Sequence, residues 1–371
     1  MKNKIFKYDF LIVGAGLVGS LAAIALHKKK YQVLVIEKNK QFPKDERTLA
    51  VNANSRDFLI NLGIWKYLKS NFESIDKIVI NDYVNKEDLI FQNAEESMGS
   101  VIFNKSLLKI SREYLIKNEI LLTNIDFDKF NFKPKKTFLI NSKKFIFNKI
   151  IFSLGRSYEN YDTIKKNTFD FGHKAYVGFF NHQKNHNQTA YEVFTPSGPL
   201  AVLPSPCTKK KSSTFIFSTK NRMNHNNLST MIKKYFYSSH GKINLKSSIS
   251  YYPIRPHLSR PIKKDILLIG DTAHSIHPVA GQGWNLGIKD IQTLCSCLDM
   301  NDINGTNFDD VYFSRRIVQN FTYLAFTNIL NQLYENQNPI TKSIINTSHL
   351  VLSRFPYLKN LFIKQAMGRI N

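Results

Sequence analysis

The sequence has few cysteines, and this shortage excludes a disulfide-stapled protein. Its 371 residues include only three cysteines, Cys207, Cys295 and Cys297. Three cysteines do not make a disulfide framework, and the Cys295-Ser-Cys297 spacing is neither a redox motif nor a zinc motif. We therefore expect the protein to work in the reducing environment of the cytoplasm.

Acidic residues are also scarce: 28 Asp and Glu stand against 52 Lys and Arg, which gives a net charge of +24. Such an excess favours an anionic partner, such as nucleic acid, an acidic lipid or a phosphate-bearing cofactor. Lys, Asn, Ile and Phe are abundant together, which is typical of codon bias rather than of a selected patch. Because the sequence shows no zinc-finger, RNA-recognition or helix-turn-helix signature, we expect no nucleic-acid partner and favour an acidic membrane surface.

A long apolar run is missing as well. Residues 10–26 come closest, and the preceding Lys2, Lys4 and Lys7 imitate a signal peptide. The stretch is slightly short for a membrane span and is interrupted by three glycines. With 43% hydrophobic and 22% charged residues, the chain is typical of a globular protein that holds two domains or one domain with a large insertion.

The three glycines, Gly14, Gly16 and Gly19, have the spacing G-x-G-x-x-G. They lie between a predicted buried strand at residues 10–13 and a predicted helix at residues 17–26. Gly14 permits a tight turn, Gly16 lets a pyrophosphate approach the backbone, and Gly19 lets the helix pack closely on the strand. The helix N-terminus then offers unpaired N–H groups to the phosphates.

A second predicted strand, residues 33–36, ends in Glu37, and this completes the pattern of a dinucleotide site. The Glu37 carboxylate can bind a ribose diol, and its charge argues against a 2′-phosphate. The motif leaves open whether the dinucleotide is FAD or NAD. The residues that we expect to bind its ADP half are Gly14, Ala15, Gly16, Leu17, Val18, Gly19, Glu37 and Lys38.

The remaining segments alternate between strand-like and helical patterns. Ser55 is expected to cap a short helix, and Asn104 precedes a longer one. Several β-rich runs within residues 171–254 predict one sheet of a second domain. Helical patterns dominate after residue 283, and the sequence contains no internal repeat.

A second glycine-rich motif follows a predicted strand at residues 265–269. Gly281 and Gly283 bring backbone N–H groups close to a ligand where a helix begins, and a helix N-terminus can stabilise an anionic ring edge. Asp271, at the end of the strand, can accept a hydrogen bond from a ribitol or ribose hydroxyl. Asp271 and Asp290 could instead form an acid pair, but we expect Asp290 at a solvated helix position.

This second motif resembles the second FAD motif of class A flavoprotein aromatic hydroxylases. The similarity covers Gly270-Asp271 and His274-x-x-His277-Pro278-x-Ala-Gly281-Gln282-Gly283-x-Asn285. It is strongest to the ubiquinone-biosynthesis hydroxylases, the 2-polyprenylphenol/6-methoxyphenol hydroxylase type. The resemblance extends over nearly the whole chain, through residues 47–55, 190–204, 312–316 and 355–368.

The resemblance implies an α/β fold. A Rossmann-like FAD-binding domain would be interleaved with a β-sheet substrate domain, as in p-hydroxybenzoate hydroxylase, and followed by C-terminal helices. The implied FAD-binding parts are residues 1–75, 104–170 and 255–330. The implied substrate-domain parts are residues 76–103 and 171–254, and the C-terminal helices are residues 331–371.

The resemblance also implies site residues. Those expected to bind FAD beyond the first motif are Arg47, Asn104, Gly155, Asp271, Pro278, Gly281, Gln282, Gly283, Trp284 and Asn285. Tyr191, Pro199 and Leu203 would lie on the sheet that covers the substrate ring. A surface position for Arg47, a packed sheet position for Tyr191 and a pocket-wall position for Trp284 are the structural alternatives.

The implied reaction is the hydroxylation of a polyprenylated phenol in ubiquinone biosynthesis. NAD(P)H would reduce FAD, O₂ would add at the flavin C4a position, and the distal oxygen of the hydroperoxide would pass to the phenol. Because the flavin carries this chemistry, we assign no catalytic side chain. His274 and His277 alone are too few for a metal site, so we expect none.

One departure from the resemblance favours an alternative function. The related enzymes have Ala-Asp-Gly-x-x-Ser where this chain has Ser153-Leu154-Gly155-Arg156-Ser157. Leu154 replaces an aspartate that is implicated in FAD and NAD(P)H contacts. The chain could therefore be a flavin-binding accessory subunit of a quinone-biosynthesis complex, and an FAD hydroxylase of another aromatic or lipid substrate is a further alternative.

The C-terminal residues 340–370 combine apolar residues at helical spacing with basic residues. Packing against the FAD domain would explain the pattern. Peripheral contact with the inner face of a membrane, to receive a polyprenyl substrate, is the other interpretation.

Overall fold

A computed structural model describes residues 5–41, 45–68, 71–85, 87–125, 137–140, 143–155, 164–206, 210–245, 248–260, 265–303, 305, 307–336 and 338–370. Arg156, Ser157 and Cys207, which the sequence analysis named, lie outside these residues.

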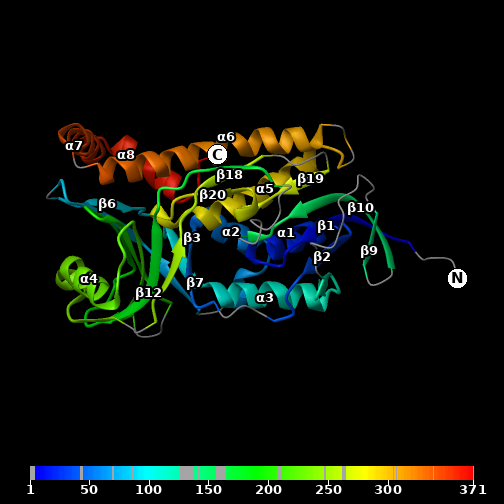
Figure 1. The fold of residues 1–371 in the computed structure, drawn as a ribbon, viewed down its shortest axis with the longest axis horizontal. Helices are drawn as coiled ribbons and strands as arrows, with labels where there is room; N and C mark the ends of the chain where they lie inside the picture. Colours follow the sequence, from blue (N-terminus) through cyan, green and yellow to red (C-terminus); the bar gives the residue numbers. More distant parts are fainter. Residues whose placement is uncertain are drawn as a thin grey trace.

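A mainly parallel sheet of six strands forms the centre of one half of the molecule (Figure 1). Its order is β19 (Ile266–Leu268), β10 (Lys143–Phe152), β1 (Ile5–Val13), β2 (Val33–Glu37) and β8 (Leu121–Thr123), and β9 (Thr137–Ile140) pairs antiparallel with β10. The chain proceeds from β1 to β2 on one side and later places β10 on the other side of β1. This reversal is a topological switch point, where open α/β sheets bind ligands.

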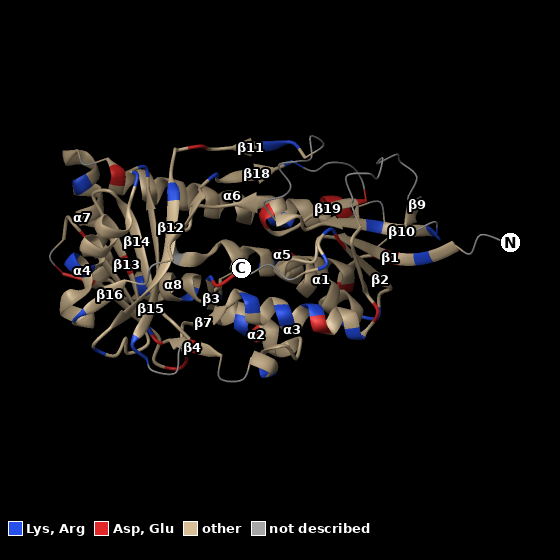
Figure 2. Ribbon diagram, turned by 60° about the horizontal axis from the view of Figure 1, so that its bottom comes forward, with Lys and Arg blue, Asp and Glu red and all other residues tan. Residues whose placement is uncertain are grey.

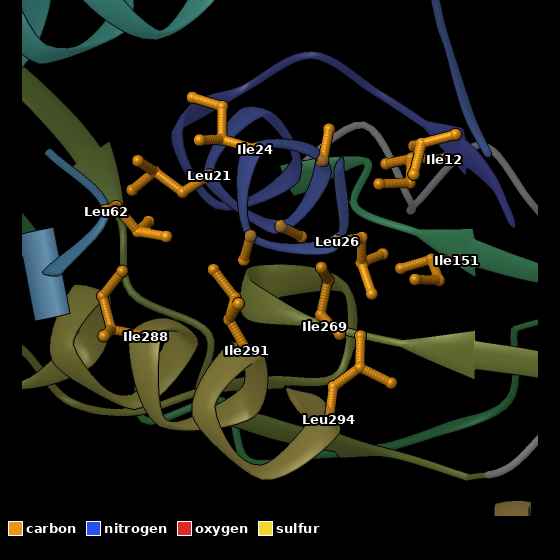
Figure 3. Packing of buried hydrophobic residues seen from close by; sticks show 14 of the residues in the cluster. Ile12, Leu21, Ile24, Leu26, Leu62, Ile151, Ile269, Ile288, Ile291 and Leu294 are labelled. Atoms are coloured by element: carbon orange, nitrogen blue, oxygen red, sulfur yellow. The ribbon is translucent and has the colours of Figure 1, made fainter. Parts of the chain in front are cut away.

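Helices α1 (Leu17–Lys28) and α5 (Gly283–Met300) pack together against one face of this sheet. Every residue from 19 to 26 of α1 is buried, as expected for a helix that is covered on all sides. Helix α3 (Asn104–Lys117) packs against α1 as well. Figure 3 shows the resulting core, which includes Ile12, Leu21, Ile24, Leu26, Ile151, Ile269, Ile288, Ile291 and Leu294.

An eight-stranded sheet forms the other half of the molecule. Its order is β16 (Ile243–Leu245), β12 (Lys174–His182), β15 (Ser212–Thr219), β14 (Gly198–Pro204), β13 (Thr189–Thr195), β5 (Lys77–Asp82) and β6 (Leu89–Gln92), and β17 (Ser250–Pro253) pairs with β12. Helix α4 (His225–His240) covers one face. Strands β5 and β6 join this sheet from an early part of the chain, and the domain boundaries given above remain a proposal.

Two three-stranded sheets lie beside these elements. One contains β3 (Thr48–Asn52), β7 (Gly99–Phe103) and β4 (Phe72–Ile75), and the other contains β11 (Lys166–Thr168), β18 (His257–Ser259) and β20 (His274–Ser275). Helix α2 (Ala53–Asn61) follows β3, and short 3-10 turns span Trp65–Leu68, Gly270–Thr272 and Val279–Gly281. The expected cap of α2 was wrong: Asn52 is the N-cap, and its side chain accepts the Ser55 N–H at 2.9 Å.

Three helices complete the chain: α6 (Phe308–Glu335), α7 (Pro339–Arg354) and α8 (Pro356–Ala366). Helix α6 runs along one side of the molecule, past both large sheets (Figure 1). Near its start the Tyr312 hydroxyl donates to the Leu268 carbonyl at 3.2 Å, and near its end Tyr334 stacks on Phe194 at 3.8 Å between ring centroids. Within the described part of the chain, no helix has the length and apolar character that crossing a bilayer requires.

Candidate FAD site

A cavity of about 1030 Å³ opens at the carboxyl ends of the parallel strands and continues to the eight-stranded sheet. This volume is at the upper end of the usual range for ligand sites, as a dinucleotide requires. The cavity brings together most of the residues predicted from the sequence. Those in its wall are Gly14, Gly16, Leu17, Val18, Glu37, Lys38, Arg47, Asn104, Gly155, Leu203, Asp271, Pro278, Gly281, Gly283 and Trp284.

The glycine turn after β1 has the geometry of a phosphate cradle. Gly14 has a φ of +101°, and a Cβ there would lie 2.3 Å from the Ser153 carbonyl oxygen. A Cβ on Gly19 would lie 2.1 Å from the Gly14 oxygen, so this glycine packs the helix rather than lining the cavity. A Cβ on Gly16 would meet nothing within 4 Å. Gly16 is also the N-cap of α1, and because it has no side chain it leaves the helix N-terminus open to a ligand phosphate.

Glu37 closes the cradle through a partner that the sequence analysis missed. Its Oε2 accepts the Ala15 N–H at 2.8 Å and lies 3.2 Å from the Arg112 Nη2. Arg112 is buried on α3, and its Nε donates to the Ala15 carbonyl at 2.8 Å. An arginine between Leu108 and Leu115 on the apolar face of α3 was the available signal.

Arg47 is held in the cavity wall by a second missed residue, Asp45. Arg47 Nε and Nη2 lie 2.8 Å and 2.6 Å from the two Asp45 oxygens, and Asn104 Nδ2 also donates to Asp45. The guanidinium stands 5.0 Å above the Tyr252 ring. Burial raises the pKa of the Asp45 carboxyl, but the hydrogen bonds and charge of Arg47 outweigh burial and hold that pKa below its usual range. Arg47 is therefore a fixed cation at the cavity.

Some residues of the second glycine motif line the cavity, and others hydrogen-bond the motif to the neighbouring strand β3. Asp271 lines the cavity at the 3-10 turn after β19, and Gly281 has a φ of +61° with its Cβ direction filled by Ala50 at 3.1 Å. Asn285 points instead at strand β3, where its Nδ2 donates to the Ala50 carbonyl at 2.9 Å. The Asn52 side-chain Nδ2 donates to Gln282 Oε1 at 3.4 Å. Gln282 and Asn285 thus hold the motif in place.

Asp290 corrects an expectation. It is fully buried rather than solvated, and its carboxylate accepts from His274 Nε2 at 2.8 Å, Arg316 Nε at 2.6 Å and the Gly270 N–H at 2.8 Å. Burial raises the pKa of this carboxyl, but the charges of His274 and Arg316 outweigh burial and hold the pKa below its ordinary value. The network fixes the turn that carries Asp271.

The second histidine of the motif, His277, also faces away from the cavity wall. Its Nε2 lies 3.1 Å from Nδ1 of His173, and His173 contacts Glu335 at the end of α6. Among the described residues, no cluster of three or more His, Cys, Asp or Glu could hold a metal ion.

The face of the eight-stranded sheet toward the cavity is apolar. Val177, Leu203 and Ile216 line it, and they come from β12, β14 and β15. Tyr191 lies on the opposite face, with its ring 5.4 Å from Phe236 of α4, which is the packed position that was its alternative. Pro199, opposite Phe194 in the β13–β14 pair, is buried but is not in the wall of the cavity.

Leu154 is the residue that the family resemblance sets where an aspartate is expected. Its N–H donates to Thr272 Oγ1 at 2.7 Å, so it ties the end of β10 to the turn after β19. The side chain packs against the apolar cluster on the second face of the parallel sheet. Gly155 follows with a φ of +57°, and nothing lies within 4 Å of its Cβ direction. The turn is therefore open to a ligand but lacks the acidic group.

Known proteins match this chain in sequence and structure. Residues 218–309 match the family model of an FAD binding domain, and residues 12–43 match that of an NAD(P)-binding Rossmann-like domain. Ubiquinone hydroxylase UbiL of Rhodospirillum rubrum is 24% identical, over 98% of this chain and 90% of that protein. The 3-demethoxyubiquinol 3-hydroxylase of Escherichia coli is 23% identical, over 97% of this chain and 98% of that protein.

Among solved structures, p-nitrophenol 4-monooxygenase PnpA from Pseudomonas putida has a TM-score of 0.78 at 14% identity and covers 98% of both chains. The fold, the cavity and these matches define the class: the chain is an FAD-dependent monooxygenase with the class A fold. Its matched segments are those of an FAD binding domain and of an NAD(P)-binding Rossmann-like domain. Its relatives within that class include the two ubiquinone-biosynthesis hydroxylases named above.

Proposed function

We propose that the protein hydroxylates a polyprenylated phenol in ubiquinone biosynthesis, with FAD as cofactor, NAD(P)H as reductant and O₂ as the oxygen source. The homologous ubiquinone hydroxylases support this choice of substrate. The proposal includes peripheral contact with a membrane or with a quinone-synthesis complex, because the prenyl chain must reach the cavity.

The observation that carries the proposal is the continuity of the cavity. One space joins the glycine turn at Gly14 and Gly16 to the apolar sheet face at Val177 and Ile216. A dinucleotide anchored at the turn would extend past residues 278–284 toward that face. A phenol placed there would then meet the reactive end of the cofactor.

The residues of the chain have separate roles in this arrangement. The α1 N-terminus and Gly16 would bind the pyrophosphate, and Glu37 would bind the adenosine ribose. Arg47, fixed by Asp45, supplies positive charge beside the cofactor. The apolar sheet face would orient the aromatic ring and exclude water. When bound, FAD supplies the redox chemistry with O₂ and NAD(P)H.

The cavity wall also offers a hydrogen-bond donor that a bound FAD could use. Trp284 is in the cavity wall, and its buried Nε1 has no acceptor among the described residues. A flavin or substrate oxygen would satisfy this donor.

Leu154 supports a second candidate function, that of a flavin-binding accessory subunit. The aspartate that it replaces is associated with reductant contacts in the related enzymes. An accessory subunit would bind FAD at the same cradle without turning over.

A single set of measurements separates the two candidates. The purified protein with FAD is mixed with a short-chain prenylated phenol, NADPH or NADH, and isotopically labelled O₂. The hydroxylase is expected to consume reductant only when phenol is present and to place one labelled oxygen atom in the product. Flavin that binds but is never reduced would support the accessory subunit, and a protein that takes up no FAD would overturn both.

A further inference from the structure

Helix α6 exposes an apolar surface that a helix facing water does not ordinarily carry. Residues 317–334 contain no Lys, Arg, Asp or Glu. Val318, Phe321 and Ile329 are 65%, 59% and 58% exposed. Together with Ala325 they follow one another in steps of three or four residues, so they share the outer face of the helix. Adjoining exposed apolar residues of this kind mark an interaction site.

The exposed apolar surface continues onto the last two helices. Phe362 of α8 and Phe326 of α6 are both exposed, and their ring centroids lie 6.5 Å apart. Tyr357, at the start of α8, is 78% exposed. We define the C-terminal apolar surface as these residues together with exposed apolar residues of α7: Val318, Phe321, Phe326, Ile329, Ile340, Ile344, Tyr357, Leu361 and Phe362.

The charged side chains of the two C-terminal helices, α7 and α8, have one sign. Residues 336–371 contain no Asp or Glu but five basic residues, Lys342, Arg354, Lys359, Lys364 and Arg369. Arg369 pairs with Asp57 and Glu96 on the body of the protein. Lys342, Arg354 and Lys364 are exposed on α7 and α8, the helices that also carry exposed Ile340, Ile344, Tyr357, Leu361 and Phe362. If a second copy of this chain bound here, the positive charges of the two copies would come together and repel. An anionic lipid surface would instead neutralise them.

We propose that the outer face of α6, with α7 and α8, lies on an anionic bilayer surface, with its apolar side chains inserted between the head groups. Apolar burial and attraction of basic residues to anionic lipid act together in such interfacial binding. The inference rests on the proposed function for its purpose, because a polyprenylated substrate resides in the bilayer. The surface itself is independent of the reaction.

Vesicle binding by the FAD-loaded protein tests this proposal. Phosphatidylcholine vesicles with and without phosphatidylglycerol are sedimented with the wild-type protein, with Phe321→Ser/Ile329→Ser, and with Lys342→Glu/Lys364→Glu. We expect binding that requires phosphatidylglycerol and weakens with salt. The apolar variant should bind about tenfold or more weakly, and the charge variant should lose about fivefold per removed cation.

Matched controls come from α3, which lies on the opposite side of the molecule from α6 (Figures 1 and 2). Figure 2 also shows Lys and Arg along α3. Ile116→Ser and Lys117→Glu change residues that are equally exposed there and should leave vesicle binding unchanged.

Three results would overturn the proposal: no binding to anionic vesicles, equal losses in the α3 controls, or a wild-type dimer that Phe321→Ser/Ile329→Ser dissociates while vesicle binding persists. Light scattering after size exclusion measures the last of these. Hydroxylation of a short-chain phenol in detergent is measured in parallel. This reaction should be unaffected by the α6 variants, so failure of the surface and failure of the proposed reaction are distinguishable.

Discussion

Arg112 of α3 and Glu37 at the end of β2 meet over the glycine turn, with Arg112 Nη2 3.2 Å from Glu37 Oε2. Both side chains also bind Ala15, one at its carbonyl and the other at its N–H. The pair therefore fixes the backbone that the cofactor phosphates must approach. Burial lowers the pKa of Arg112, whereas the charge of Glu37 raises it.

We predict that Arg112→Met weakens FAD binding about tenfold or more. A hydrogen bond to a charged group contributes about 1.5–3 kcal/mol, and about 1.4 kcal/mol corresponds to tenfold in affinity. Quenching of flavin fluorescence on titration measures the dissociation constant. Lys109→Met, on the exposed side of the same helix, is the control. Equal affinities for the two variants would contradict a role for Arg112 at the cradle.

Substitution of two glycines of the first motif should have different effects, one on stability and the other on FAD affinity. Gly19→Ala places a Cβ 2.1 Å from the Gly14 oxygen, so we expect a lower melting temperature even without cofactor. Gly16→Ala meets no protein atom within 4 Å, so the apoprotein should melt as the wild type does. Its affinity for FAD should nevertheless fall by about tenfold, or 1.4 kcal/mol, because the methyl group occupies the phosphate approach. Thermal melts with and without FAD distinguish these effects.

Removal of the Arg316 charge should destabilise the whole protein. In Arg316→Met the buried Asp290 carboxylate keeps His274 but loses its 2.6 Å partner. Breaking one side of a buried ion pair costs about 3–5 kcal/mol, and denaturant unfolding measures this loss. Asp290→Asn with Arg316→Met should recover part of the stability. A double variant that is no more stable than Arg316→Met would show that the charge of Asp290 is not the cause.

The same carboxylate gives stability a dependence on acid. The pKa of Asp290 is below its ordinary value of 3.8 in the folded protein, so the unfolded chain takes up the proton first as the pH falls. Its contribution is therefore present at neutral pH and is lost below about pH 4.

Three buried histidines at the C-terminal end of α4 predict a pH effect in a milder range. His182, His186 and His240 lie together, with the rings of His182 and His240 4.6 Å apart. Burial lowers the pKa of His186 to about 4 and that of His240 to about 3. Below pH 6.5 the unfolded chain gains protons that the folded chain does not, so the melting temperature should fall from pH 7 to pH 5.

A substitution tests the histidine contribution directly. His240→Phe keeps an aromatic ring beside Phe236 and Tyr191 but removes one titrating group. The fall in melting temperature between pH 7 and pH 5 should be smaller in this variant. His225→Phe, at the exposed start of the same helix, should retain the wild-type slope. If both variants keep that slope, the His240 explanation is wrong.

Local sequence patterns were sufficient for the strand, the turn and the helix of each glycine motif. Gly14 and Gly16 are only two positions apart, so one turn determines their geometry, and Asp271 follows its strand directly. Both motifs meet at one cavity because the strands that precede them are parallel. The FAD-binding fold followed from these patterns together with the family resemblance.

The missed and misplaced residues depend on contacts that sequence spacing does not reveal. Arg112 reaches Glu37 from 75 positions away, and Arg316 reaches Asp290 from another helix. Tyr191, which was expected to contact the substrate, packs against α4 instead, for a different reason. Successive strand residues face opposite sides, and here α4 covers one face while the cavity lies against the other, so both faces are apolar.

The cavity wall is assembled from segments as distant as Gly14, Asn104, Gly155 and Asp271. A cofactor in that space would cross-link parts of the chain that otherwise meet only through packing. Binding to the folded chain alone stabilises it by about 2.7 kcal/mol when free ligand is at a hundred times its dissociation constant. The supply of FAD in the cell would then lengthen the time that each newly made molecule survives proteolysis, before any substrate is encountered.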